Sequence, residues 1–147
     1  MLSKRESQFL AECRIAHLAT ADRQAIPHVV PVCFAVLEGT LYVTIDEKPK
    51  RGPVAALKRL KNISENAAVA IVADRYEEDW RRLGWVMLHG RAEILSHGME
   101  HDEAQMLLRH RYPQLERMRI TAHPVIAVRI ERVTSWGNLA VAGMARS

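Results

Sequence analysis

Three stretches of the chain carry apolar residues at helical spacing. The first runs from residue 3 to residue 13, where Ser3 and Glu6 fit a capping box and Phe9 and Leu10 share a face. The second starts at Pro53 and ends near residue 66. Its apolar positions are Val54, Leu57, Leu60 and Ile63. With the third stretch, 98–111, the pattern predicts three helices.

Six other stretches are rich in β-branched and aromatic residues or alternate between apolar and polar positions. They predict strands at 14–22, 25–39, 40–46, 67–74, 85–95 and 124–137. The run at 67–74 is almost wholly apolar, which predicts burial on both faces, whereas the alternation in 124–137 predicts one solvated face.

Two prolines and a turn set the expected pairing of the second and third strands. Because proline cannot donate to a strand ladder, Pro27 and Pro31 place 25–39 at an edge, a bulge or a ligand-facing stretch. Glu38-Gly39 forms a tight turn, so 25–46 is predicted to be a hairpin. Six antiparallel strands joined by helices indicate a mainly β fold, a small barrel or strongly curled sheet.

Length and composition predict one globular domain spanning 1–147. The chain has 147 residues, 48% hydrophobic and 26% charged, and its formal net charge is +4. No apolar run reaches the ~20 residues of a membrane span. The charged N-terminus lacks the pattern of a signal peptide, and Cys13 and Cys33 are expected to be free thiols in a reducing cytoplasm.

A basic segment follows the strand that ends in "TID". From residue 48 to residue 61 there are six cations and no acid: Lys48, Lys50, Arg51, Lys58, Arg59 and Lys61. The last three fit a solvated helix face. The first three precede a helix within a frame of prolines and glycine, which predicts a phosphate site because helix N-terminal amides add to the side-chain charge.

The three tryptophans provide a second indication of a ligand. Trp85 begins a strand, where core packing is the simplest expectation. Trp80 and Trp136 lie in polar surroundings, where a large ring more often lines a pocket or an interface. A planar aromatic cofactor with a phosphate tail would explain both the tryptophans and the basic segment.

Other chemistries are disfavoured by the sequence. The sequence from His97 to His101 matches H-x-x-E-H, but Gly98 interrupts it at a helix start and no third ligand follows, so no metal site is expected. Cys13 and Cys33 lie in apolar surroundings typical of inert thiols. The G-x-S-x-G, G-x-G-x-x-G and Walker motifs are absent from the sequence.

The chain resembles the split-barrel flavin and deazaflavin proteins related to pyridoxamine 5′-phosphate oxidase. The resemblance runs from about Phe9 to Trp136. It is most specific in the blocks "DEKPKR", "RLKNI" and "YEEDWRRLGWV", which are similar to the subgroup of probable coenzyme F-420-dependent enzymes. It implies a six-stranded antiparallel split β-barrel with connecting helices that forms a homodimer, with a cofactor at each of two sites across the interface.

The resemblance also implies where the cofactor, FMN or coenzyme F-420, would bind. The strand from 30 to 34 would offer backbone groups to the ring, through Val30, Pro31, Val32, Cys33 and Phe34. Val43 and Thr44 would lie near the cofactor chain. Lys48, Lys50 and Arg51 would meet its phosphate, with the choice between Lys48 and Lys50 open.

Two departures from the family pattern limit which properties of the family are expected in this chain. Ala67 stands where the family commonly has proline, which affects only a turn. The C-terminal segment lacks the arginine-x-histidine substrate motif of true pyridoxamine phosphate oxidases, which argues against that reaction.

These features predict an oxidoreductase that transfers a hydride between FMN or coenzyme F-420 and an unidentified small molecule. The cofactor supplies the chemistry, so no acid–base pair is expected among the side chains. The alternative is a non-enzymatic FMN-binding protein of the same fold. A nucleic-acid module is disfavoured because stacking aromatics do not alternate with the basic residues. No membrane partner is expected.

Overall fold

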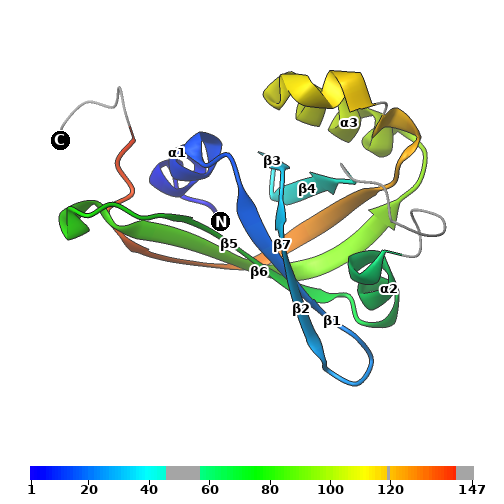
Figure 1. Ribbon diagram of the computed structural model, residues 1–147, viewed down its shortest axis with the longest axis horizontal. Helices are drawn as coiled ribbons and strands as arrows, with labels where there is room; N and C mark the ends of the chain where they lie inside the picture. Colours follow the sequence, from blue (N-terminus) through cyan, green and yellow to red (C-terminus); the bar gives the residue numbers. More distant parts are fainter. Residues whose placement is uncertain (46–56, 119, 142–147) are drawn as a thin grey trace.

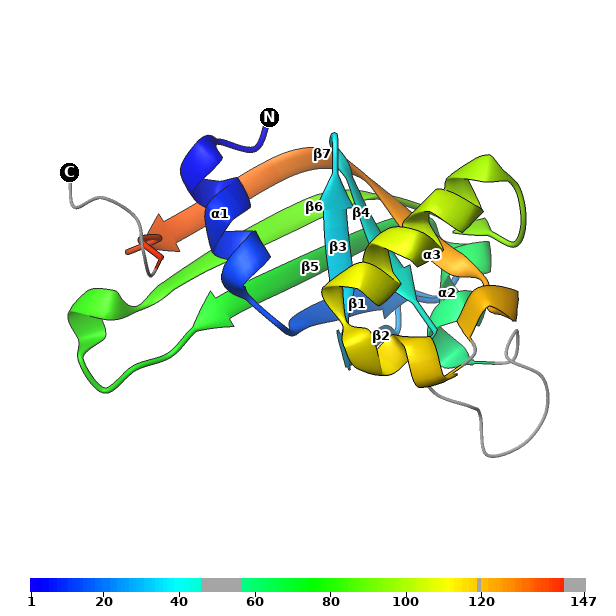
Figure 2. The same cartoon turned by 90° about the horizontal axis from the view of Figure 1, so that it is seen from above.

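The computed structural model describes residues 1–45, 57–118 and 120–141. A single antiparallel sheet organises them, in the strand order β2-β1-β5-β6-β7-β4-β3 (Figures 1 and 2). Its strands are β1 (Ala16–Ala21), β2 (Pro27–Val32), β3 (Phe34–Leu37), β4 (Thr40–Thr44), β5 (Ala68–Arg75), β6 (Gly84–Leu95) and β7 (Val125–Gly137). The predicted mainly β fold with a curled antiparallel sheet is confirmed.

Three α-helices and three short 3₁₀ turns connect the strands. They are α1 (Lys4–Glu12), α2 (Lys58–Glu65), α3 (Met99–Arg111), η2 (Trp80–Arg82), η3 (Pro113–Met118) and η4 (Ile120–Ala122). The capping box of α1 is present, since the N–H of Ser3 donates to Glu6 at 2.9 Å and the N–H of Glu6 donates to Ser3 at 3.1 Å. The predicted start of α2 at Pro53 lies outside the described residues.

The stretch 25–39 forms two strands rather than one. It breaks at Cys33, so that β2 pairs with β1 while β3 pairs with β4. The sheet therefore has seven strands rather than six, and the predicted hairpin is confined to β3 and β4. Since β2 and β3 adjoin in the chain but lie at opposite ends of the strand order, the sheet must curl into a half-barrel. Pro27 and Pro31 lie on the edge strand β2, as predicted.

Two apolar cores fill the fold. The first lies inside the curled sheet, where Phe9 and Leu10 of α1 and Leu60 and Ile63 of α2 pack against the strands. The second lies between α3 and the other face of β3, β4 and β7, around Leu108. Because α3 covers this face, Val125 to Val128 are all buried, and the predicted solvated face of β7 is wrong for this half of the strand.

Two further predictions about burial are wrong. In β5, Val69, Ile71 and Ala73 are buried but Ala68 and Asp74 are exposed, because neither core reaches the second face of this strand. In α2, Arg59 is 5% exposed and does not lie on a solvated face; only Lys58 and Lys61 do.

The elements that frame the predicted site lie at two ends of the sheet. The β5–β6 turn with η2 forms one end, and α2 lies at the other (Figures 1 and 2). Among the described residues, no helix has the length and apolar character needed to cross a membrane.

Candidate functional site

A buried polar network fixes the end of β4, where the basic segment begins. The Thr44 hydroxyl, 2% exposed, donates to Gln105 Oε1 of α3 at 3.2 Å, and Gln105 Nε2 donates to the carbonyls of Ile120 and His123 at 2.9 and 3.1 Å. His123 Nδ1 lies 2.7 Å from the carbonyl oxygen of Ile45. The network therefore holds the last described residue before the segment 46–56 against α3.

His101 belongs to the same network and explains the H-x-x-E-H pattern. Its Nε2 lies 2.8 Å from the His123 carbonyl and its Nδ1 lies 3.0 Å from Asp102. Burial disfavours the charged ring, but these two contacts outweigh it and raise the pKa of His101. Both ring nitrogens are engaged, and the described residues contain no cluster of three or more potential metal ligands.

A second buried polar cluster lies between β1 and α2, the first helix after the segment 46–56. Asn62 Nδ2 donates to the Thr20 hydroxyl of β1 at 3.0 Å, and both residues are buried. Thr20 lies opposite His28 of β2. Asn62 Oδ1 and His28 Nδ1 are buried without a hydrogen-bond partner among the described residues. Two buried, unsatisfied polar atoms, one on the partner of Thr20 and one on the residue opposite it, indicate a place that a polar ligand group would complete.

Sequence reasoning missed this cluster. Asn62 sits in the quoted block "RLKNI", between apolar positions of a predicted helix. A polar side chain at a helix position that faces the core needs a partner, and this requirement was the available indication. Lys48, Lys50 and Arg51, the predicted phosphate ligands, lie outside the described residues, so their role stays a prediction.

The residues predicted to lie near the cofactor ring and chain fall on both sides of the break at Cys33. Val32, Phe34 and Val43 are buried in the first core, and Phe34 lies opposite Val43. On β2, Val30 is half-buried and Pro31 is exposed; Cys33 is also half-buried. Side chains on the core side of this region are thus already used for packing, and contact with a ring through backbone groups stays a prediction.

The tryptophans gather at the other end of the sheet. Trp136 of β7 lies directly opposite Trp85 of β6, and it is 54% exposed. Trp80, in η2, is 69% exposed, and its indole N–H donates to the Tyr76 hydroxyl at 3.4 Å. Large aromatic side chains with this exposure are typical of residues that meet a ligand or a partner.

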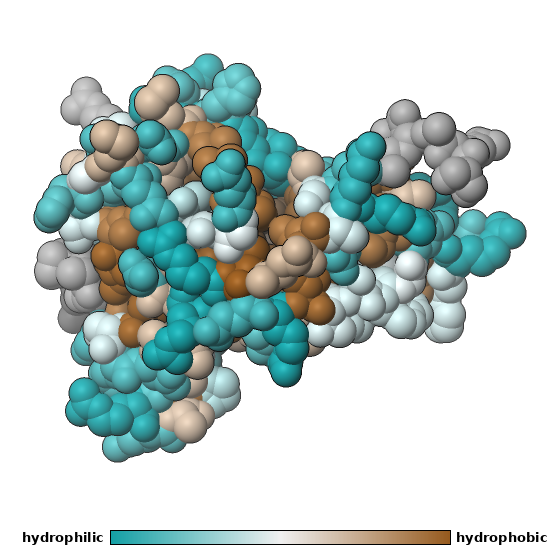
Figure 3. Space-filling view, turned by 180° about the vertical axis from the view of Figure 1, so that it is seen from behind, coloured by the Kyte–Doolittle hydropathy of each residue, from teal (hydrophilic) through white to brown (hydrophobic). Residues whose placement is uncertain are grey.

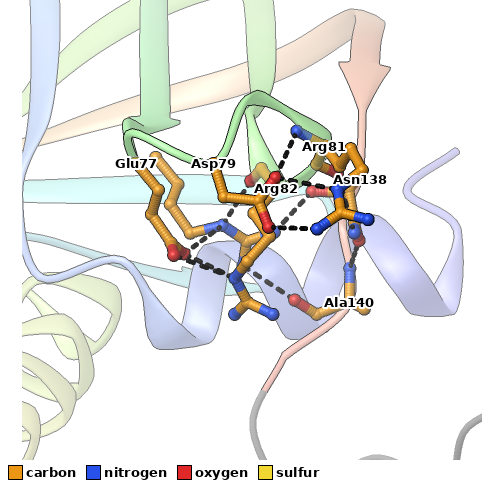
Figure 4. Close-up of polar contacts among 7 residues, drawn as sticks. Glu77, Asp79, Arg81, Arg82, Asn138 and Ala140 are labelled. Atoms are coloured by element: carbon orange, nitrogen blue, oxygen red, sulfur yellow. Dashed lines mark hydrogen bonds and ion pairs between the residues drawn. The ribbon is translucent and has the colours of Figure 1, made fainter.

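A set of arginine contacts makes this end of the sheet rigid (Figure 4). Arg75 donates to the carbonyl oxygens of Arg82, Asn138 and Ala140 at 2.9, 2.7 and 2.7 Å. Arg82 pairs with Glu77 at 2.8 Å. Arg81 pairs with Asp79 at 3.0 Å. Arg75 joins β5 and the β5–β6 turn to the segment that follows β7, and the other two pairs lie within the turn, so together they hold the turn that carries Trp80.

The two ends do not meet within one chain. Trp85 lies six residues along β6 from Arg91, which pairs with Ala68 just after α2. Six residues of strand span about 20 Å. The tryptophans therefore lie far from the Thr20–Asn62 cluster and from the ends of the segment 46–56.

The outer face of β1, β2, β5 and β6 belongs to neither core. Its side chains include Val29, which is 63% exposed, and the half-buried Val72 and Met87. His89 also lies on this face, and its Nδ1 has no hydrogen-bond partner among the described residues. We call this surface the outer face. Exposed and half-buried apolar side chains of this kind are typical of a surface that a partner protein covers.

Comparison with known proteins identifies the family. The family model described as pyridoxamine 5′-phosphate oxidase matches residues 2–137. No curated protein matches the chain. Among solved structures, a conserved hypothetical protein from Mycobacterium tuberculosis is 19% identical, with a TM-score of 0.74 over 100% of this chain and 93% of that one.

Two other solved structures name ligands. An FAD-binding protein from Mesorhizobium loti is 22% identical, with a TM-score of 0.68 over 87% of each chain. A heme storage protein from Vibrio cholerae is 15% identical, with a TM-score of 0.71 over 92% of this chain and 94% of that one. At these identities the likeness concerns the fold. The family match, over nearly the whole length, shows that the chain belongs to the pyridoxamine 5′-phosphate oxidase family.

Proposed function

We propose that the protein is a homodimer that binds FMN or coenzyme F-420 between its subunits and transfers a hydride between that cofactor and a small molecule. One observation carries the proposal. The exposed tryptophans and the polar cluster beside the basic segment lie at opposite ends of one chain's sheet. A second copy, related by two-fold symmetry, would bring the tryptophan end of one subunit to the basic end of the other.

The outer face supports the dimer. Val29, Val72 and Met87 form an apolar surface that a second copy would bury, and His89 Nδ1 would gain a partner there. Obligate dimer interfaces are more apolar than ordinary surface, and this face has that character.

The polar atoms fit the class of cofactor. Lys48, Lys50 and Arg51 are the candidates to hold a phosphate, and Asn62 Oδ1 and His28 Nδ1 can accept hydrogen bonds from the hydroxyls of a sugar-like chain. Trp80 and Trp136 of the other subunit would cover the ring and exclude water. When bound, the flavin or deazaflavin supplies the hydride chemistry, and the side chains bind and orient it.

The runner-up is a non-enzymatic FMN-binding protein. Cys13 and Cys33 form no disulfide in the part of the chain that the structure describes, which is compatible with both proposals. Heme is a further candidate ligand because a structural neighbour is named as a heme storage protein. Neither alternative requires that the protein catalyse a reaction.

The test is a titration followed by single-turnover kinetics. We expect FMN or coenzyme F-420 to bind with a stoichiometry of one per subunit and to perturb the cofactor spectrum. The reduced complex is then mixed without oxygen with a panel of unsaturated small molecules. Oxidation of the bound cofactor by one of them supports the enzyme; tight binding without any oxidation supports storage. Failure to bind either cofactor, together with tight heme binding, would overturn both flavin proposals.

A further inference from the structure

A separate cavity lies between α1, α3 and the edge strand β3. Its volume is about 730 Å³, within the range of ligand pockets. None of its described lining residues belongs to α2, β5 or β6, which carry the two ends of the candidate cofactor site; it shares only Phe34 with the residues expected near the cofactor ring. In Figure 2 the β3–β4 turn points toward the top of the picture, and apolar residues gather in the middle of the face that Figure 3 shows.

The edge of β3 presents backbone groups to this cavity. The turn Glu38-Gly39, with φ of 47° and 80°, closes the pair formed by Leu37 and Thr40. In such a hairpin, alternate residues direct their N–H and C=O away from the partner strand, and these are Phe34 and Val36. At Phe34 the Tyr112 hydroxyl accepts from the N–H at 3.1 Å and lies 3.0 Å from the carbonyl oxygen.

Val36 has no equivalent of Tyr112. Among the described residues, no hydrogen bond outside the strand ladder reaches its N–H or its C=O. An edge residue whose N–H and C=O are both unpaired can form two hydrogen bonds with one residue of another extended chain. The cavity walls beside it are apolar and include Leu10, Leu107 and Ile130. The edge therefore offers two backbone hydrogen bonds beside an apolar surface.

One end of the cavity is cationic. Arg14 and Arg111 line it, and none of the ion pairs between described residues involves either of them. Arg111 is held in place because it donates to the carbonyls of Ala11, Leu10 and Cys13 and to the Tyr112 hydroxyl, and it lies 4.9 Å from the centre of the Phe34 ring. Arg14 donates to the carbonyl oxygen of Arg111 at 2.7 Å, so both guanidinium groups are bonded to neutral oxygens and to no carboxylate among the described residues. A half-buried positive charge without a carboxylate favours an anionic ligand group.

We propose that this cavity binds the C-terminus of an extended, apolar peptide. One peptide residue pairs its N–H and C=O with Val36, in the manner of strand addition. The peptide runs antiparallel to β3, so that its next residue ends the chain with a free carboxylate near Arg14. The next residue lies opposite Ala35, one step of about 3.3 Å along β3, so its terminal carboxylate extends toward Phe34, where Arg111 packs 4.9 Å from the ring centre.

The probe is a pool of fluorescein-labelled tetrapeptides made of Leu, Val, Ile and Phe, prepared with a free C-terminal carboxylate and, separately, with a C-terminal amide. Fluorescence anisotropy with the full chain should show that amidation weakens binding at least about tenfold. Arg14→Gln should weaken binding of the acid pool by a similar factor, whereas Arg14→Lys, which keeps the charge, should not. Both variants lose the guanidinium that donates to the Arg111 carbonyl oxygen at 2.7 Å and lies 4.6 Å from the centre of the Tyr112 ring.

Val36→Pro removes the edge-facing N–H while leaving the ladder to β4 intact, and Val36→Thr is its matched control. We expect the proline variant, with an unchanged circular dichroism spectrum, to lose binding at least about tenfold and the threonine variant to keep it. Equal binding of the acid and amide pools, or no binding of either at millimolar concentration, would overturn the proposal. So would a wild-type dimer that Val36→Pro converts into monomers in sedimentation, because the edge would then pair with a second copy.

Discussion

Trp85 of β6 and Trp136 of β7 lie directly opposite each other at one end of the sheet. Residues opposite each other in an antiparallel pair share a face. The pair therefore places Trp85 beside the predicted ring ligand Trp136, although the sequence favoured a core role for Trp85. Exposure still separates them, because Trp136 is exposed and Trp85 is half-buried.

Trp136→Leu should weaken FMN and riboflavin equally. An exposed ring that stacks on an aromatic ligand contributes roughly 1–2 kcal/mol, independent of a phosphate. Isothermal titration with each ligand measures the loss. Thermal stability should change little, since Trp136 is 54% exposed. A loss confined to FMN would show that Trp136 does not meet the ring.

The double variant Lys50→Ala/Arg51→Ala should show the opposite selectivity. It should weaken FMN by a few kcal/mol, since each charge-assisted hydrogen bond is worth roughly 1.5–3 kcal/mol, and leave riboflavin almost unaffected. Lys61→Ala is the control, because Lys61 is exposed on α2 whereas Arg59 is buried. FMN binding at parental strength in the double variant would remove the basic segment from the site.

Glu100 should contribute to stability only above acidic pH. Arg129 donates to both of its carboxylate oxygens, at 2.6 and 2.9 Å, and Tyr42 donates at 2.6 Å. These contacts lower the pKa of Glu100 from 4.5 to about 2. A carboxylate with a lowered folded pKa stabilises the fold above its unfolded pKa, and the contribution disappears as the pH falls from 4.5 toward 2.

Glu100→Gln should therefore cost about 1 kcal/mol at pH 7, a value reduced for the partial exposure of the side chain, and nearly nothing near pH 2. Urea unfolding at several pH values measures the difference. Glu103→Gln, on the exposed side of the same helix, is the control. A constant difference across the whole pH range would show that the ion pair is not its cause.

Arg75→Ala should release the segment after β7. Arg75 supplies hydrogen bonds to three carbonyl oxygens, two of them beyond β7, at Asn138 and Ala140. Leaving these groups without a donor should cost roughly 2–3 kcal/mol. Hydrogen exchange of Leu139 and Ala140 should accelerate. Arg81→Ala, whose side chain is 90% exposed, should change neither measurement; equal effects of the two variants would contradict the assignment.

The sequence predicted the positions of the helices and strands better than it predicted which of their faces are buried. The capping box at Ser3 and Glu6 and the turn at Glu38-Gly39 depend on local chemistry, and both are present. The break at Cys33 was missed because it depends on long-range contacts, including the hydrogen bonds between Phe34 and Tyr112. Burial on the second face of β5 and β7 depends on where α3 packs, which strand periodicity does not encode.

The site was only partly predictable for the same reason. Exposed tryptophans and a basic segment are visible in a sequence, but the distance between them is not. The Thr20–Asn62 contact joins residues 42 positions apart, and no local pattern marks Thr20.

The central claim is that each cofactor site uses two subunits, and a heterodimer tests it most directly. Co-expression of Trp136→Leu and Lys50→Ala/Arg51→Ala chains with different tags allows purification of the mixed dimer. If both subunits contribute to each cofactor site, one site of the mixed dimer combines the wild-type Trp136 with the wild-type basic segment. The other site carries the substitutions in both. The account predicts about one FMN per mixed dimer bound at parental affinity, and no site of that affinity in either parent homodimer. A mixed dimer without any tight site would contradict it, because the tryptophan and the basic segment would then act within one chain.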